Sequence, residues 1–248
     1  MSEIKENEMT AQVQSTPGND LNTKADPDWK PLYKLGGVSA LMMIAIIIVQ
    51  MVFFITAPQP LEGTVIDWFR LFQNNKLVGL INFELLMIVY VFLSIPITLS
   101  LYVLLRQVNP SFTAIYLVLS LIGIICFVAA RPAFEMLSLS NGYAAATTDA
   151  EKTLYLSAGQ VMMAAFNGTS FHTSYVLGSI SGLIISLVML KTNTFNKATA
   201  YVRIASSVFD FGLYIPTVGV FISIFSVLFL FIWNIMIARR LLQLGKRQ

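Results

Sequence analysis

The side chains of this sequence that could do chemistry are a few charged and polar groups within or beside long apolar runs. Glu84 and Asp210 lie inside two such runs, and Arg131, Glu135 and His172 lie near the ends of two others. A charge among apolar residues is costly unless it meets an opposite charge, water or a ligand. We therefore expect these five residues to form a polar cluster that binds something, or ion pairs and hydrogen bonds with a structural role.

Of the five residues, Glu84 most needs a partner or a water-filled cavity, because its side chain is too short to reach water from within the apolar run. Lys76 is eight residues away on the same run and should point away from it. Arg131 is the better partner if its run packs beside that of Glu84. Arg203 is six residues from Lys197 at the start of its run, and we expect its long side chain to reach water.

The residue counts exclude several kinds of catalytic and metal site. The single histidine, His172, rules out sites that need two, and the single cysteine, Cys126, rules out a disulfide within the chain. The sequence GTSF at 168–171 resembles the serine motif of rhomboid-type proteases. Ser170 and His172 diverge by about 200° on a helix, so they cannot pair. We predict no catalytic residue, no cofactor and no metal site.

The longest uncharged stretch, residues 211–238, is followed at once by Arg239 and Arg240. About 20 apolar residues in a helix cross the hydrocarbon core of a bilayer. Only 12% of the chain is charged, against about 25% in soluble domains, and 56% is hydrophobic. The sequence therefore predicts an integral membrane protein whose first partner is the lipid bilayer.

The predicted fold is all-α, a polytopic transmembrane helix bundle of about six spans plus two short interfacial amphipathic helices. Pro96 offers a kink site in the second span. The amphipathic helices cover about 64–75 and 148–166; in the first, Val65, Trp68, Phe69 and Phe72 share one face. The six spans cover about residues 32–57, 77–105, 112–130, 169–190, 198–214 and 218–238.

The domain limits follow from composition. Residues 1–30 are polar and acidic, so we expect a disordered N-terminal tail without the basic start of a signal peptide. Residues 31–243 form the six-span domain, and 244–248 form a basic C-terminal tail.

Basic residues predict the orientation, because they collect on the cytoplasmic side of membrane proteins. With six spans, twelve of the sixteen lysines and arginines lie on the side of the two termini. We therefore predict a cell (cytoplasmic) membrane protein with both termini in the cytoplasm, and the five candidate site residues in the outer half. The basic residues form no single stripe, so no nucleic-acid partner is expected.

The fourth span carries a helix-packing ladder of small residues at every fourth position, namely Ser170, Ser174, Gly178, Gly182 and Ser186. Such a ladder lets another helix approach closely. The partner helix lies in the same subunit or in a second copy, which would make a homo-oligomer through span four. We expect a large side chain at Gly178 or Gly182 to force the facing helix away.

Several short motifs resemble a known prokaryotic family of six-span integral membrane proteins, catalogued as domain-of-unknown-function family 4386. They are YAAA at 143–146, AFNGT at 165–169, SYVLG at 174–178, FGLYIPTVG at 211–219 and WNIMIARRL at 233–241. The resemblance covers about residues 30–245. It implies six spans and a bacterial or archaeal cytoplasmic membrane, and it brings no activity or site residues.

Two functions fit these observations. The first is a non-enzymatic membrane protein that binds a small molecule, lipid or partner helix through its outer-leaflet half. The alternative is a small secondary transporter or channel-like protein that uses Glu84 and Asp210 within the membrane. A transport role would be recognised by a solute flux that depends on these carboxylates.

Overall fold

The computed structural model describes residues 26–60 and 63–246, and these residues form helices and no strand. The elements are η1 (Pro27–Trp29), α2 (Lys30–Thr56), α3 (Val65–Asn74), α4 (Lys76–Asn82), α5 (Leu85–Leu105), α6 (Pro110–Ala129), α7 (Ala133–Ala145), α8 (Asp149–Phe166), α9 (Thr169–Met189), α10 (Lys197–Phe211), η2 (Gly212–Tyr214) and α11 (Gly219–Lys246). Asparagine side chains at 75, 109 and 196 cap α4, α6 and α10, because each accepts a backbone N–H of the first turn.

The predicted tails are only partly within the described residues. Residues 1–25 and 247–248 of the two tails lie outside them. Asp26 caps η1, where its carboxylate accepts the N–H of Asp28 at 3.1 Å, and α2 begins at Lys30. At the other end α11 continues to Lys246, so ordered helix extends into both segments that we expected to be tails.

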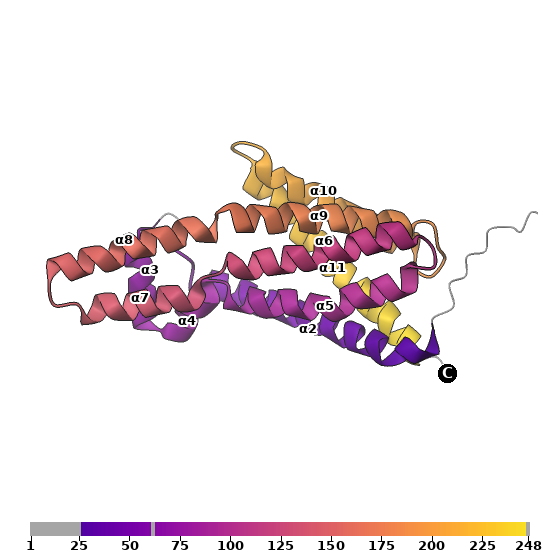
Figure 1. The fold of residues 1–248 in the computed structure, drawn as a ribbon, viewed down its shortest axis with the longest axis horizontal. Coiled ribbons are helices and arrows are strands. Elements are labelled where there is room, and N and C mark those ends of the chain that lie inside the picture. The colour runs from indigo at the N-terminus through magenta and orange to yellow at the C-terminus, as the bar shows by residue number, and fades with distance from the viewer. Residues whose placement is uncertain (1–25, 61–62, 247–248) are drawn as a thin grey trace, which may run out of the picture.

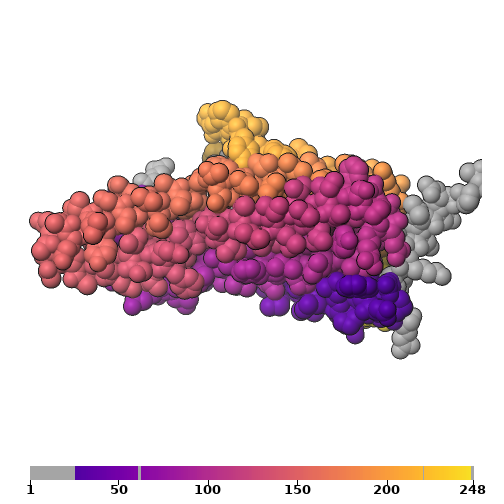
Figure 2. All heavy atoms as spheres, in the orientation of Figure 1, coloured from indigo at the N-terminus to yellow at the C-terminus, as the bar shows by residue number. Residues whose placement is uncertain are grey.

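Six helices, which run lengthwise through the molecule in Figure 1, form a ring in which each packs against two neighbours. The order around the ring is α2, α5, α6, α9, α10 and α11, and α11 closes it against α2. Large apolar side chains are exposed on the ring, among them Ile55, Ile125 and Phe221, each at least 68% exposed. Figure 2 shows one face of the ring, formed by α6 and α9. An exposed apolar surface of this extent is typical of a face that meets lipid.

Five segments are long and apolar enough to cross a membrane, namely Pro27–Thr56, Leu85–Leu105, Pro110–Ala145, Asp149–Met189 and Phe221–Lys246. The predicted fifth span, 198–214, becomes α10 followed by the short η2. With 15 residues, α10 is only about 22 Å long, which is less than the roughly 30 Å of a bilayer core.

The two ends of the described chain lie at the same end of the ring. The start of α2 packs on the end of α11 so closely that a Cβ at Gly37 would lie 2.6 Å from Leu242 Cγ. At this end the guanidinium of Arg106, at the end of α5, lies over the ring of Trp29. Arg240 donates to the carbonyl of Thr194, which lies in the loop between α9 and α10.

Helices α3, α4, α7 and α8 form a cap at the other end of the ring (Figure 1). The residues of α3 expected to face the membrane, Val65, Trp68, Phe69 and Phe72, are all buried, and they pack with Phe83, Ala133 and Met136 in one cluster. The expected second amphipathic helix is α8, which forms a hairpin with α7. The apolar face of α3 therefore packs on protein, whereas α8 leaves Leu154 and Val161 exposed. The placement of both helices at a membrane surface stays a prediction.

Candidate functional site

The ring of six helices surrounds a cavity of about 270 Å³, to which every one of the six contributes lining residues. Its wall includes the aromatic rings of Tyr90, Phe127, Tyr175 and Trp233. Polar side chains also line it, among them Ser94, Thr98, Ser120, Ser174, Ser181 and Asn234. A polar interior behind an apolar exterior is the arrangement that a membrane bundle uses to hold a polar ligand.

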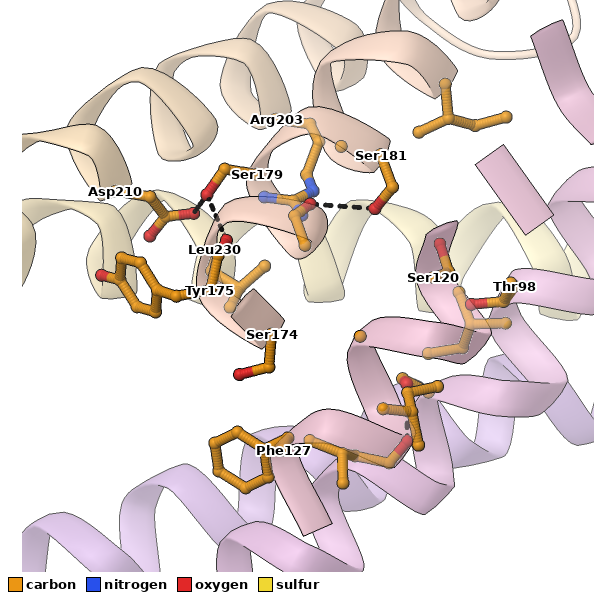
Figure 3. Close-up of a pocket in the computed structure, with 18 of the residues that line it drawn as sticks. Thr98, Ser120, Phe127, Ser174, Tyr175, Ser179, Ser181, Arg203, Asp210 and Leu230 are labelled. Carbon is orange, nitrogen blue, oxygen red and sulfur yellow. Dashed lines mark hydrogen bonds between the residues drawn. The ribbon is translucent and has the colours of Figure 1, made fainter. Parts of the chain in front are cut away.

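Arg203 of α10 lies in this cavity, beside the backbone of α9 (Figure 3). Its Nη1 donates to Ser206 Oγ at 3.2 Å and its Nη2 to the carbonyl of Gly178 at 3.3 Å. The guanidinium also lies 5.5 Å from the centre of the Trp233 ring. The expectation that Arg203 reaches water at the membrane surface is therefore wrong, because its charge is turned inward.

The small residues of α9 make room for this guanidinium. A Cβ at Gly182 would lie 2.5 Å from Arg203 Cζ and 2.5 Å from Ser207 Oγ, so only glycine fits there without a shift. Gly178 differs, since it lines the cavity and a Cβ there would meet nothing within 4 Å. At Gly182 an added side chain would first meet Arg203 and Ser207 of α10. The expected clash of a large residue at Gly178 with a facing helix stays a prediction.

Asp210 lines the same cavity, seven residues after Arg203 on one face of α10 and about 10 Å along its axis. Its Oδ2 accepts the hydroxyl of Ser179 at 3.1 Å, and Tyr175 lies beside it (Figure 3). Among the described residues the two ion pairs within 4.0 Å involve neither Asp210 nor Arg203. The cavity therefore holds one positive and one negative side chain that do not pair.

Two further polar atoms of the wall have no hydrogen-bond partner among the described residues. They are Trp233 Nε1, on a side chain of a residue 7% exposed, and Oδ1 of the fully buried Asn234. The amide nitrogen of Asn234 donates to Tyr90 Oη at 3.4 Å, so only its oxygen is left over. Buried polar atoms without partners are costly, and a bound polar molecule would satisfy them.

The structure pairs Glu84 with Arg131, the partner expected from the sequence, at 2.6 Å between Glu84 Oε2 and Arg131 Nε. Glu84 joins α4 to α5 with a left-handed φ of 62°. Arg131 Nη1 also donates to the carbonyls of Ala130 and Phe166. Three phenyl rings surround the guanidinium, at 4.3 Å for Phe127 and Phe166 and 5.0 Å for Phe171. This pair ties the cap to the ring.

The other expected members of the polar cluster lie apart from this pair. His172 Nδ1 is 3.3 Å from Tyr214 Oη, and the histidine side chain is exposed. Glu135 is exposed on α7. The five residues are thus divided among the cap junction, an exposed aromatic pair, the surface of α7 and the central cavity, where we expected one outer pocket. Among the described residues, no group of His, Cys, Asp and Glu could hold a metal ion.

The helix-packing ladder of α9 faces the inside of this chain. Ser174, Gly182 and Ser186 are buried, and Ser170 and Gly178 are partly buried. At Gly123 of α6, a Cβ would lie 3.5 Å from the carbonyl of Ser174, which shows how closely the two helices approach. The ladder therefore packs within one subunit, and a homo-oligomer through span four stays a prediction.

Comparison with known protein families, with characterised proteins and with solved structures finds no match to this chain. Its class follows from its own geometry, since five helices long and apolar enough to cross a membrane are those of a multi-pass membrane protein. The resemblance to the six-span prokaryotic family stays a prediction.

Proposed function

We propose that this chain is a non-enzymatic membrane protein that binds the carboxylate group of a small solute in the central cavity through Arg203. The observation that carries the proposal is the Arg203 guanidinium, which lines the cavity and has no carboxylate of the described residues within 4.0 Å. A charge inside a bundle marks a ligand site by default. The proposed site lies at the centre of the ring, deeper than the outer half that the sequence favoured.

The chemistry of the site fits a carboxylate. A guanidinium has five N–H donors in a planar fork, and the bonds of Arg203 to Ser206 and Gly178 use two of its nitrogens for one acceptor each. A carboxylate can accept two parallel N–H bonds from such a fork. The cavity of about 270 Å³ is close to the lower limit of small-molecule pockets, roughly 300 Å³. A solute of a few carbon atoms is therefore the right size.

Ligand-dependent stability of the purified protein in detergent tests this proposal. Acetate and propionate should raise the thermal unfolding midpoint of the wild type, because a ligand that binds only the folded state stabilises it. The shift should disappear in Arg203→Gln and in Gly178→Leu, which fills the cavity. It should persist in Arg70→Gln, which removes an exposed arginine of the cap. An equal shift in Arg203→Gln would show that the anions act elsewhere.

For the membrane placement we propose six spans, with α10 as the short fifth span and both termini in the cytoplasm of a prokaryotic cell. The adjacency of the two chain ends supports an even number of crossings. The arginines and lysines near that end support a cytoplasmic location. Reporter fusions after Gln243 and within residues 1–25 should both report cytoplasm, and one within 141–150 the outside. An exported fusion at Gln243 would contradict this topology.

Secondary transport of the bound solute is the second candidate function, and Pro96 is the observation that favours it. Pro96 lies inside α5 between the wall residues Ser94 and Ile97. Proline lacks the N–H of the helix ladder, and helices broken near their ligand site are common in transporters. Proteoliposomes should then accumulate labelled propionate under a proton gradient, and Asp210→Asn should abolish the uptake. If the protein binds propionate but proteoliposomes take up none, the transport function is contradicted and only the binding function remains.

A further inference from the structure

Within the cavity, Asp210 is as poorly matched by its surroundings as Arg203. The Ser179 hydroxyl that donates to Asp210 Oδ2 at 3.1 Å lies 2.9 Å from the carbonyl of Tyr175. A hydroxyl has one proton, so it cannot donate fully to both acceptors. No lysine, arginine or histidine of the described residues is within ion-pair distance of this carboxylate. Asp210 therefore meets the hydroxyls of Ser179 and Tyr175 but no cation of the described residues, and an ammonium group would supply one.

The charge balance of the cavity points to the same ligand. Among the described residues, Arg203 and Asp210 are the two charged residues of its wall, one of each sign. A simple anion bound at Arg203 would leave the site with a net negative charge in a surrounding of low dielectric. A molecule that carries both signs leaves it neutral and gives each side chain its counterion. The balance thus favours a zwitterion over a simple anion.

From these observations we infer that the bound solute is a small zwitterion, whose carboxylate faces Arg203 and whose ammonium faces Asp210. This inference rests on the proposed binding function and names its ligand class. Both charged side chains leave the same face of α10 and enter one cavity. They also contact adjacent residues of α9, since Arg203 bonds to Gly178 and Asp210 to Ser179. A single short molecule along α9 can therefore meet both.

The spacing on α10 limits the length of this zwitterion. The backbones of Arg203 and Asp210 are about 10 Å apart along the helix axis. Their side chains, however, bond to adjacent residues of α9, so the charged ends lie closer together than the backbones. An amino acid with one to three carbon atoms between its two charged groups therefore fits better than a longer one. The unpartnered Trp233 Nε1 and Asn234 Oδ1 are further polar contacts on the same wall.

The experiment compares ligands on the wild-type protein by isothermal titration calorimetry in detergent. The zwitterions are glycine, β-alanine, 4-aminobutyrate and 6-aminohexanoate, and the controls with one charge are propionate and ethylammonium. One of the three short zwitterions should bind at least about tenfold more tightly than either control, since a charged hydrogen bond adds about that factor. 6-Aminohexanoate should bind more weakly than the best of them.

Two variants test which side chain binds which charged group of the ligand. Asp210→Asn should lower the affinity for the best zwitterion to that for propionate, and Arg203→Gln should lower it to that for ethylammonium. Because the ligand comparison uses the wild type alone, it decides the inference even if a variant fails to fold. Propionate binding as tightly as every zwitterion, through Arg203, would overturn the inference and leave the proposed function standing. Binding of no tested compound would overturn both.

Discussion

Alanine at two glycines of α9 should change stability in opposite directions. Alanine is favoured over glycine in a helix by about 1 kcal/mol. At Gly178 the added methyl meets nothing within 4 Å, so Gly178→Ala should stabilise the protein by up to about 1 kcal/mol. At Gly182 the methyl would lie 2.5 Å from Arg203 Cζ and Nη2, so the guanidinium must move by about an ångström to restore van der Waals distance.

The magnitude at Gly182 follows from what that movement breaks. The bond from Arg203 Nη2 to the carbonyl of Gly178 is already 3.3 Å long, so it is lost. A hydrogen bond to a charged group contributes about 1.5–3 kcal/mol, and overpacking adds about 1–3 kcal/mol. After the helical gain of about 1 kcal/mol is subtracted, Gly182→Ala should destabilise the protein by about 1.5–5 kcal/mol.

Reversible unfolding in mixed micelles, followed by circular dichroism, measures both changes. The cost of Gly182→Ala should shrink when Arg203 is replaced by Gln, whose shorter side chain does not reach the methyl. If Gly178→Ala and Gly182→Ala change stability in the same direction and by similar amounts, the Arg203 guanidinium does not lie beside Gly182. The proposed ligand site would then lose its cation.

Three further predictions concern the cap and the cavity. Glu84→Ala should lower stability by about 3–5 kcal/mol, because it strands a buried guanidinium, whereas the exposed Glu135→Ala should cost under about 1 kcal/mol, as chemical unfolding would show. Hydrogen bonds from the backbone and hydroxyl of Thr64 hold the pKa of Asp67 below its usual value, so α3 loses stability as pH falls below about 4, and Asp67→Asn should remove this dependence in amide exchange. β-Alanine should alter tryptophan emission in the wild type but not in Trp233→Phe.

The sequence predicted best where a local pattern decides the structure. The apolar face of α3 was readable because four residues at helical spacing share one side, and all four are buried. The Glu84–Arg131 pair was readable because a short, half-buried carboxylate near the end of a span has few cations within reach. In both cases the constraint lies within one helix or between neighbouring runs.

The central cavity could not be read from the sequence, because it depends on how six helices close into a ring. Arg203 has the same spacing from Lys197 whether its side chain turns to headgroups or inward, and only the packing of α9 against α10 decides between them. One signal was present: Arg203 and Asp210 are seven residues apart, so they share a helix face, and Gly182 is a glycine where the guanidinium lies.

Phe127 belongs to two sites at once, because its ring lines the cavity and also lies 4.3 Å from the Arg131 guanidinium. A solute that displaces this ring changes the surroundings of the ion pair that ties the cap to the ring of helices. Such coupling is reciprocal by thermodynamic necessity. If the solute changes the affinity of the cap for a partner by some factor, that partner changes the affinity for the solute by the same factor. Through its two contacts, the Phe127 ring would thus couple solute binding in the cavity to the attachment of the cap.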